Sequence, residues 1–124
     1  MREIETSDAP ASIGPYSQGI RDGDTIYVSG QCPINPDSGD VISQDVDEQT
    51  ACTLENVEAI LKAEDCSLDD VVKTTVYVND MRYYDTVNEV YGDYMSEPYP
   101  ARSAVEIVKL PADIKVEIDV IASI

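Results

Sequence analysis

The stretch Val71-Val72-Lys73-Thr74-Thr75-Val76-Tyr77-Val78 is apolar and rich in β-branched residues, and it decides the fold. Branched side chains pack well on a pleated surface, so this stretch predicts a β-strand. Side chains alternate along a strand, so one face should be buried by a helix, and the residues of that face are Val72, Thr74, Val76 and Val78. The stretch therefore predicts a central strand with helices packed on its sheet.

Helical patterns flank this strand on both sides along the chain. Before it, apolar residues recur at helical spacing from Val46 to Ala63, and Asp45 with Glu48 forms a capping-box-like start. After it, Asp80 is expected to cap a second helix that runs from Met81 to about Met95. That helix carries a stripe of side chains that we expect to pack in the core: Tyr84, Val87, Tyr91 and Tyr94.

The remaining apolar segments predict further strands. Asp22-Gly23 is expected to form a tight turn between two early strands, because glycine accepts a positive φ without a Cβ clash. The segments Val105 to Val108 and Lys115 to Ala122 are expected to form a closing hairpin through Leu110 to Asp113. A short strand is expected at Glu3 to Thr6.

The predicted elements form an α+β fold, with a mixed sheet and two helices on one face. With 124 residues, the chain is expected to be one domain that spans residues 1–124. A chain of this length has no third layer to cover the opposite face of the sheet. The pattern therefore favours an oligomer.

The charge of the chain limits its partners. Asp and Glu number 25 against 8 Lys and Arg, which gives a net charge of -17. This charge would repel nucleic acid and anionic lipid surfaces, so we expect neither as a partner. The acids are scattered along the chain, which indicates an acidic, halophilic surface suited to a high-salt cytoplasm. No apolar stretch has the length of a signal peptide or a membrane span, so a cytoplasmic location is expected.

The chain contains no histidine, which excludes a Ser/His/Asp or Cys/His relay and an HExxH zinc site. Its three cysteines, Cys32, Cys52 and Cys66, show no CxxC spacing, so neither a disulfide framework nor a zinc site is predicted. We expect no metal ligands and no cofactor. Any catalysis must use carboxylate, tyrosine, cysteine, arginine or backbone groups.

Arg102 follows Pro100-Ala101 at the entrance of a predicted strand, and it is one of only eight cationic side chains. Its guanidinium offers a planar fork of donors that matches a carboxylate, so a small carboxylic acid is the first ligand to consider. The alternative is an ordinary surface arginine that pairs with a nearby acid.

Glu117 interrupts a strand of apolar residues and shares a face with Asp119. It is either a solvent-facing residue of a strand edge or a general base for water. If the closing hairpin is symmetrical about Ala112, Arg102 and Glu117 lie five residues apart along the strands, which is roughly 17 Å. A small substrate does not bridge that distance, so the two residues would act together only from neighbouring subunits.

Three further positions have both a structural and a functional interpretation. Tyr16 follows the rigid Gly14-Pro15 pair, which can hold its hydroxyl in place, but it is equally well a core tyrosine. Asn88 can orient a loop or a substrate amine, or it is a solvent-facing or backbone-capping asparagine. Ser29-Gly30 ends a strand and permits either close backbone approach to a ligand or a bulge. Cys32 has no neighbouring cation to activate it, so we expect a packed side chain.

Several ordered motifs closely resemble the Rid (YjgF) family, in its RidA branch of reactive intermediate deaminases. The resemblance covers nearly the whole chain, and the motifs that carry it are Ala9-Pro10, Ile13-Gly14-Pro15-Tyr16-Ser17-Gln18, Tyr27-Val28-Ser29-Gly30-Gln31, the segment from Ser67 to Val78, Val87-Asn88-Glu89-Val90-Tyr91, Pro100-Ala101-Arg102-Ser103 and the segment from Val116 to Ala122. It implies a chorismate-mutase-like α+β fold that forms a homotrimer with its site at the subunit interface.

The resemblance also implies an activity and the residues that carry it. The activity is hydrolytic deamination of 2-iminobutanoate or 2-iminopropanoate to 2-oxo acids and ammonia, downstream of a pyridoxal-phosphate-dependent threonine or serine dehydratase. The implied residues are Arg102, Glu117, Tyr16 and Asn88 for catalysis, with Ser29, Gly30 and Ala104 for substrate binding. At Ala104 many relatives carry cysteine, so thiol-based regulation at that position is excluded. The alternative function is a non-catalytic trimer that binds or senses small carboxylic acids.

Overall fold

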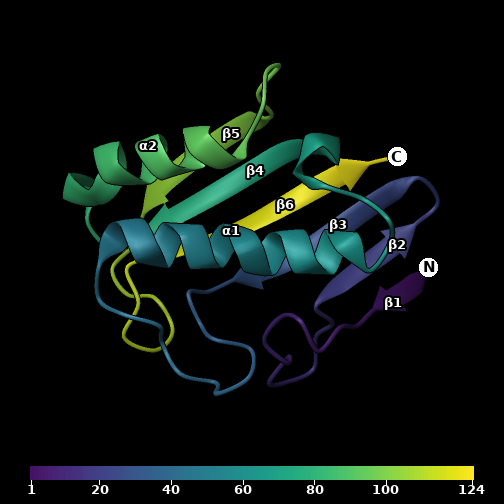
Figure 1. Cartoon of the computed structure of the whole chain (residues 1–124), viewed down its shortest axis with the longest axis horizontal. Coiled ribbons are helices and arrows are strands. Elements are labelled where there is room, and N and C mark those ends of the chain that lie inside the picture. The colour runs from purple at the N-terminus through teal and green to yellow at the C-terminus, as the bar shows by residue number, and fades with distance from the viewer.

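The strand predicted at Val71 to Val78 lies inside a six-stranded sheet of order β1-β2-β3-β6-β4-β5 (Figure 1). The computed structural model describes residues 1–124. Its elements are β1 (Arg2–Ile4), β2 (Gly19–Asp22), β3 (Thr25–Gln31), α1 (Val46–Lys62), η1 (Leu68–Asp70), β4 (Val71–Val78), η2 (Met81–Tyr83), α2 (Tyr84–Tyr94), β5 (Ala101–Glu106) and β6 (Val116–Ser123). β5 runs parallel to β4 and the other neighbouring pairs are antiparallel, so the sheet is mixed, as predicted.

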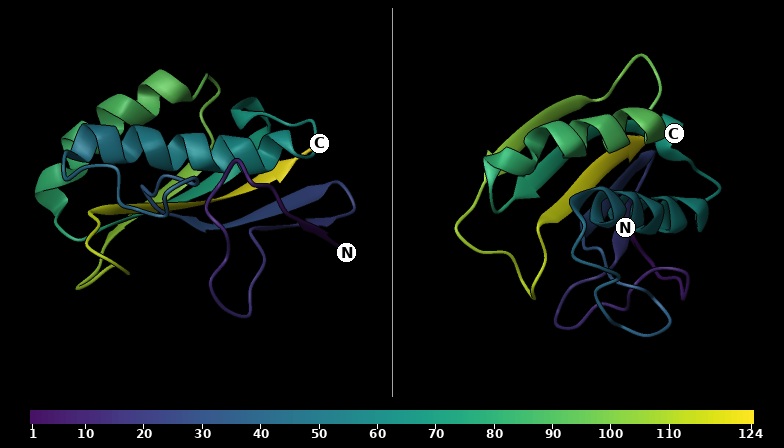
Figure 2. Two further views of the ribbon diagram at one scale, coloured as in Figure 1. Left: turned by 60° about the horizontal axis from the view of Figure 1, so that its bottom comes forward. Right: turned by 60° about the vertical axis from the view of Figure 1, so that its left-hand side comes forward.

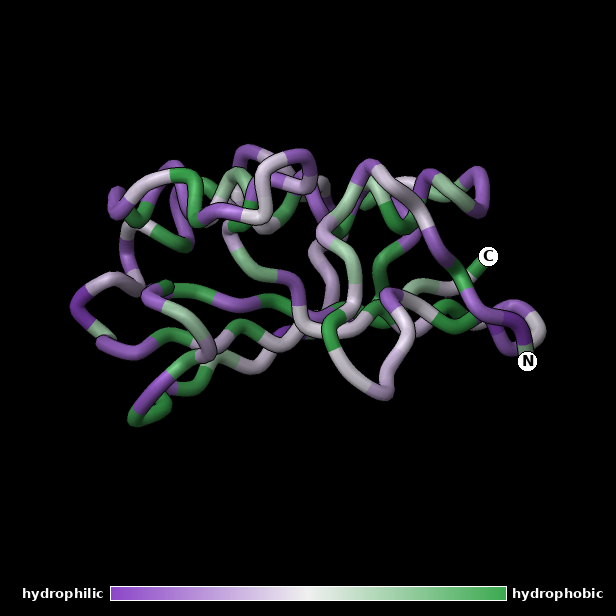
Figure 3. The backbone as a smooth tube through the Cα atoms, turned by 90° about the horizontal axis from the view of Figure 1, so that it is seen from below, coloured by the Kyte–Doolittle hydropathy of each residue, from purple (hydrophilic) through white to green (hydrophobic).

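Both α-helices cover the same face of the sheet, and the opposite face carries no helix (Figure 2). Hydrophobic segments lie in the helices and in the strands beneath them (Figure 3). The core forms between these two layers, and its most deeply buried side chains include Leu54, Val57, Ile60 and Leu61 of α1, Val87 of α2, and Val76, Val78, Val116 and Ile118 of the sheet. The α+β fold with two helices on one face is confirmed.

The buried face of β4 differs from the prediction at one residue. Val72 is 48% exposed, whereas Val71 is buried. The pairing of β4 with β6 shifts register between Val71 and Lys73. This irregularity turns Val71, in place of Val72, toward the helices, and the predicted face is right only from Thr74 onward.

The predicted closing hairpin is wrong. β5 and β6 do not pair with each other, but lie on the two sides of β4. The α2 crossover returns the chain alongside β4 in the same direction, so β5 pairs in parallel. The connection 107–115 then carries the chain to the other side of β4, and its Leu110 and Ile114 are buried, so it packs on the protein instead of forming a tight turn. Arg102 is therefore paired with Thr74, not with Ala122.

The ends of the elements agree with the prediction in part. α1 begins where expected, but the capping box is wrong, because the Asp45 side chain makes no capping hydrogen bond. Asp80 does cap the second helical segment, since its carboxylate accepts a hydrogen bond from the Arg82 backbone N–H at 2.9 Å. The predicted tight turn is confirmed, but its two turn residues are Gly23 and Asp24, because Asp22 still pairs with Thr25, and Gly23 has a φ of 62°. β1 begins and ends earlier than the predicted Glu3 to Thr6.

Candidate active site

A pocket of about 790 Å³ opens where β3 ends, between the loop before β2, the loop after β3 and the start of β6. Four of the seven predicted site residues line it: Tyr16, Ser29, Gly30 and Glu117. We call these four residues the pocket group. Arg102, Asn88 and Ala104 lie elsewhere, on α2 and β5.

Glu117 lies on the face of the sheet that the helices leave open, because its two neighbours along β6 are fully buried on the helix face. β3 bulges between Val28 and Gln31. Within the bulge, a Cβ added to Gly30 would lie 2.7 Å from Glu117 Oε2, so only glycine leaves room for the carboxylate. The bulge is therefore present, and the group that lies against Gly30 is the Glu117 side chain of the same chain.

The thiol of Cys32 is the hydrogen-bond partner of Glu117. Cys32 Sγ donates to Glu117 Oε1 at 3.4 Å. Burial raises the pKa of Glu117, and the charge of Asp119 adds to this, while the Cys32 hydrogen bond opposes it. Burial, with the Glu117 charge, raises the pKa of Cys32 to about 12, so the thiol stays protonated and is no nucleophile. Cys32 is thus more than the packed side chain that we expected.

A second acid lies next to Glu117 on the open face of the sheet. Asp119 accepts a hydrogen bond from the Tyr77 hydroxyl at 3.2 Å, and burial raises the pKa of Asp119. Tyr77 pairs with Glu117 across β4 and β6, and burial followed by the Asp119 charge raises the tyrosine pKa. Sequence reasoning did not single out Tyr77, although its alternation with the buried residues of β4 places it on this face.

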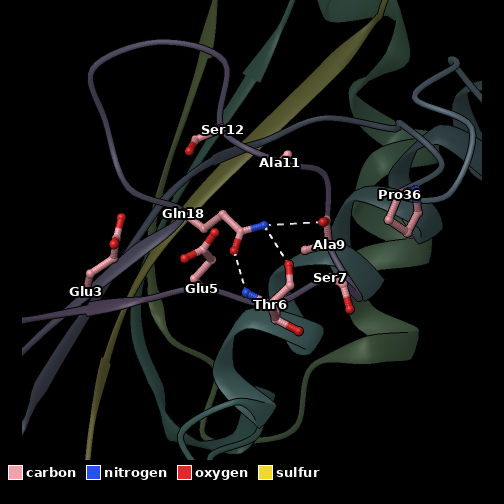
Figure 4. Close-up of a pocket in the computed structure, with 9 residues that line it drawn as sticks. All are labelled: Glu3, Glu5, Thr6, Ser7, Ala9, Ala11, Ser12, Gln18 and Pro36. Atoms are coloured by element: carbon pink, nitrogen blue, oxygen red, sulfur yellow. Dashed lines mark hydrogen bonds between the residues drawn. The ribbon is translucent and has the colours of Figure 1, made fainter.

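Gln18 holds the loop that carries Tyr16. Its carboxamide is almost fully buried and points toward the turn that begins at Thr6 (Figure 4). Gln18 Oε1 accepts from the Thr6 N–H at 2.7 Å. Gln18 Nε2 donates to the carbonyls of Thr6 at 3.0 Å, Ala9 at 3.2 Å and Pro10 at 2.8 Å. This role was not predicted, because a glutamine in a motif does not reveal which backbone groups it will satisfy.

Tyr16 and Ser29 take up their positions through the same loop. Tyr16 is 52% exposed, so it is not a core tyrosine, and its hydroxyl accepts a hydrogen bond from the Ile13 N–H at 3.2 Å. Ser29 Oγ donates to the Ser17 carbonyl at 2.6 Å, which ties β3 to the loop. The side chains of Tyr16 and Ser29 are thus held by hydrogen bonds to backbone groups of this loop.

Arg102 lies on the helix side of β5, beside two tyrosines of α2. Its Nη2 donates to the Tyr84 hydroxyl at 2.9 Å. The guanidinium carbon is 4.8 Å from the centroid of the Tyr91 ring and 5.6 Å from that of Tyr84, within reach of a cation–π attraction. Tyr91 is held in turn by its hydrogen bond to Thr74 Oγ1 at 3.1 Å.

Arg102 makes no ion pair, in contrast to every other arginine of the chain. Arg2 and Arg21 both pair with Glu64, and Arg82 pairs with Asp80. The alternative of a surface arginine paired with a nearby acid is therefore wrong within this chain. A guanidinium without a carboxylate is unusual in a chain that has 25 acidic residues.

Asn88 lies between Tyr84 and Tyr91 on α2, and its Oδ1 is buried without a hydrogen-bond partner. A buried carbonyl oxygen without a donor is costly, so a donor from a ligand would stabilise it. Ala104 lies two residues after Arg102 on the same face of β5 and packs against the core. We call Arg102, Asn88, Tyr84 and Tyr91 the helix-edge group.

The pocket group and the helix-edge group lie on opposite faces of the sheet. Across the sheet, Arg102 pairs with Thr74, and Thr74 pairs with Val120 of β6. Glu117 lies three residues before Val120 on β6, and its side chain points to the open face. Strand spacing then separates Arg102 and Glu117 by about 14 Å, with the sheet between their side chains. The predicted pairing of Arg102 with Ala122 was wrong. Even so, one chain does not bring Arg102 and Glu117 to the same small substrate.

No helix has the length and apolar character needed to cross a membrane. No three His, Cys, Asp or Glu side chains gather as metal ligands would.

The chain is a small α+β protein: two helices cover one face of a mixed six-stranded sheet, and a pocket opens at the other face. The crystal structure of Escherichia coli TdcF with bound serine superposes with a TM-score of 0.94 at 40% sequence identity, over 100% of this chain and 99% of that chain. The fold is therefore the one found in that protein.

Sequence comparison identifies the family. The family model described as Endoribonuclease L-PSP matches residues 6–124. A RutC family protein of Pyrococcus horikoshii is 48% identical over 123 residues, 98% of each chain. The 2-iminobutanoate/2-iminopropanoate deaminase of Escherichia coli K12 is 46% identical over 124 residues, 98% of this chain and 96% of that protein. The chain belongs to the Rid (YjgF) family, as its motifs indicated.

Proposed function

We propose that this chain hydrolyses reactive 2-imino acids, such as 2-iminobutanoate and 2-iminopropanoate, to 2-oxo acids and ammonia. The observation that carries the proposal is the unpaired guanidinium of Arg102 in a strongly acidic chain. Such a group selects a small carboxylate ligand, because bidentate, charge-assisted hydrogen bonds are stronger than neutral ones. A relative solved with bound serine and a relative named as a deaminase of 2-imino acids support the same ligand class.

Glu117 is the base of the proposed reaction. Its carboxylate takes a proton from water, and the hydroxide adds to C2 of the imine to give a carbinolamine. The imine nitrogen receives the proton from Glu117 as the carbinolamine forms. Glu117 then transfers the proton of the new hydroxyl to the nitrogen, and the C–N bond breaks with its electron pair going to nitrogen, which releases ammonia and leaves the 2-oxo acid. Burial raises the pKa of Glu117, which makes it a stronger base than an ordinary glutamate. These steps need no metal or organic cofactor.

We further propose that the site is shared between subunits of a homotrimer. The helix-edge group of one subunit would face the pocket group of its neighbour, which brings Arg102 and Glu117 to one substrate. The orphaned Asn88 Oδ1 would accept a hydrogen bond from the substrate nitrogen. Side chains such as Tyr27 and Val105 are exposed on the open face, which suits it to cover by a second copy.

The partners follow from the same chemistry. A pyridoxal-phosphate-dependent threonine or serine dehydratase is proposed as the source of the imine. Nucleic acid is not proposed as a substrate, because a net charge of -17 opposes binding to a polyanion.

The test couples pure protein to such a dehydratase and follows loss of the imine by semicarbazide trapping. Arg102→Ala should lose both turnover and 2-oxobutanoate binding, whereas Glu117→Gln should lose turnover and keep binding. Binding of 2-oxobutanoate by a wild-type protein without turnover would instead assign the chain as a carboxylic-acid binder or sensor.

Mixed trimers test whether the site is shared. Each variant should be inactive alone. An equal mixture of Arg102→Ala and Glu117→Gln subunits, refolded together, should have an intact pair at about a quarter of its interfaces. We expect about 25% of the wild-type activity per site. No recovery in mixed trimers would place the site within one chain.

A further inference from the structure

Cys32 is fixed in place against the Glu117 carboxylate by a buried anchor. It follows β3, and its carbonyl accepts a hydrogen bond from Asn56 Nδ2 at 2.9 Å. Asn56 is on α1, only 4% exposed, and also donates to the Ile34 carbonyl at 3.0 Å. The backbone at Cys32 is therefore tied to the helix layer, and the direction of its side chain is set independently of Glu117.

The two oxygens of Glu117 have different surroundings. Oε1 accepts the hydrogen bond from Cys32 Sγ at 3.4 Å. Oε2 lies over the backbone of Gly30, at 2.7 Å from the position of an added Cβ, and has no hydrogen-bond donor. The carboxylate is thus held on one side by a donor and on the other by a backbone that only glycine can supply.

We propose that Cys32 is a positioning residue for catalysis: its thiol holds Oε1, so that Oε2 faces the pocket and takes the proton from water. This inference rests on the proposed function, because it assigns a task to the base of that reaction. In this role Cys32, which also lines the pocket, acts through Glu117 and forms no covalent bond during turnover.

A thiol suits this task better than the stronger donors. It is a weak donor, so it orients the carboxylate with little loss of basicity, whereas a cationic donor would stabilise the charged form strongly. With its pKa raised to about 12, the thiol also remains protonated wherever Glu117 titrates. The other titratable groups near Glu117 are Asp119 on the same strand, Tyr77 on β4, and Tyr16 and Asp37 in the pocket lining, and none of them donates a hydrogen bond to it.

The first measurement is the pH profile of kcat/KM for Cys32→Ala and Cys32→Ser. Loss of the donor raises the pKa of Glu117. The acid limb of the profile, where kcat/KM falls because Glu117 is protonated, should therefore move to higher pH in Cys32→Ala. At a pH below that limb we expect about a twofold loss, the low end for one hydrogen bond, because the thiol is a weak donor. Cys32→Ser keeps a donor and should restore the limb to the wild-type position or below it. A purely structural role would lower the melting temperature of Cys32→Ala and leave its acid limb unchanged.

The second measurement reads the contact without any turnover. Alkylation of each cysteine by iodoacetamide is followed by mass spectrometry in wild type and Glu117→Gln. The negative charge of Glu117 raises the pKa of Cys32, so its removal should accelerate Cys32 alkylation at least about threefold. Cys52, whose pKa is raised by burial and by Glu55, serves as the internal control and should not respond. Asp119→Asn, which removes a neighbouring charge but not the partner, should leave the Cys32 rate close to wild type.

The outcomes separate this inference from the proposed function. An unchanged acid limb in active Cys32→Ala, or unchanged Cys32 alkylation in Glu117→Gln, overturns the role of Cys32 and leaves the deaminase standing. Absence of turnover in the wild-type protein overturns the deaminase, and the positioning role with it, whatever the alkylation rates.

Discussion

Gly30→Ala should separate activity from stability. A Cβ at this position would lie 2.7 Å from Glu117 Oε2 and 2.9 Å from its Cδ. Ordinary contact begins near 3.4 Å, so the carboxylate must retreat by about 0.7 Å. Displacement of a reacting group by about 1 Å can cost about 10²-fold in rate, and we expect a loss of that order in kcat/KM.

The fold should tolerate the same change. The clashing atoms belong to the end of a side chain, and Gly30 has no positive φ, so alanine adds no backbone strain. Overpacking costs about 1–3 kcal/mol, and the lower entropy of the unfolded chain offsets about 0.4–1 kcal/mol of it. The measurements are imine loss in the coupled assay and urea unfolding. Gly92→Ala is the control, because nothing lies within 4 Å of its added Cβ, and it should keep full activity. Wild-type turnover in folded Gly30→Ala would refute the geometry assigned to the base.

Four further predictions test other parts of the molecule. The pKa of Glu117 is raised in the folded state, so its contribution to stability is present at low pH and is lost as the pH rises through that pKa. Glu117→Gln removes this loss, so calorimetry should show a higher melting temperature than wild type at pH 7. The difference should shrink toward pH 4. Gln18→Ala should lower the free energy of unfolding by about 2–4 kcal/mol, read by urea titration, because it leaves buried backbone groups of the Tyr16 loop without partners. Tyr84→Phe should raise KM about two- to tenfold with little change in kcat, since Arg102 loses the hydrogen bond that orients it. The melting temperature should rise between low salt and about 1 M NaCl, where charges are screened within about 3 Å, and a fall would refute the account of the acidic surface.

The fold was predictable wherever a local pattern reports burial. The apolar residues from Val46 onward gave α1, and the β-branched run gave β4, because helical spacing and strand alternation leave a direct mark on the sequence. The partner of β5 left no such mark. The pattern from Val105 to Val108 is compatible with one arm of a hairpin and with a strand parallel to β4. The crossover through α2 makes the strand parallel.

The site was predictable as residue types, but not as an arrangement. Arg102 was found because a guanidinium is scarce in this chain, and Glu117 because it interrupts an apolar strand. The contacts that surround them were not. Cys32 carries no neighbour in sequence that indicates a carboxylate partner, and Tyr84 was expected only to pack in the core. Such contacts arise between segments that are distant along the chain, so a single sequence does not reveal them.

The position of β6 has a consequence for how the molecule folds. β6 lies between β3 and β4, and it alone connects the β1-β2-β3 part of the sheet to the β4-β5 part. Its pairing of Thr25 with Ser123 closes a loop of about four-fifths of the chain. Long-range closures of this kind make folding slow, because chain entropy is lost before the contacts form. The two parts can form early as local units, but the sheet becomes continuous only when the strand that carries Glu117 enters, so the base is assembled in the same event that completes the fold.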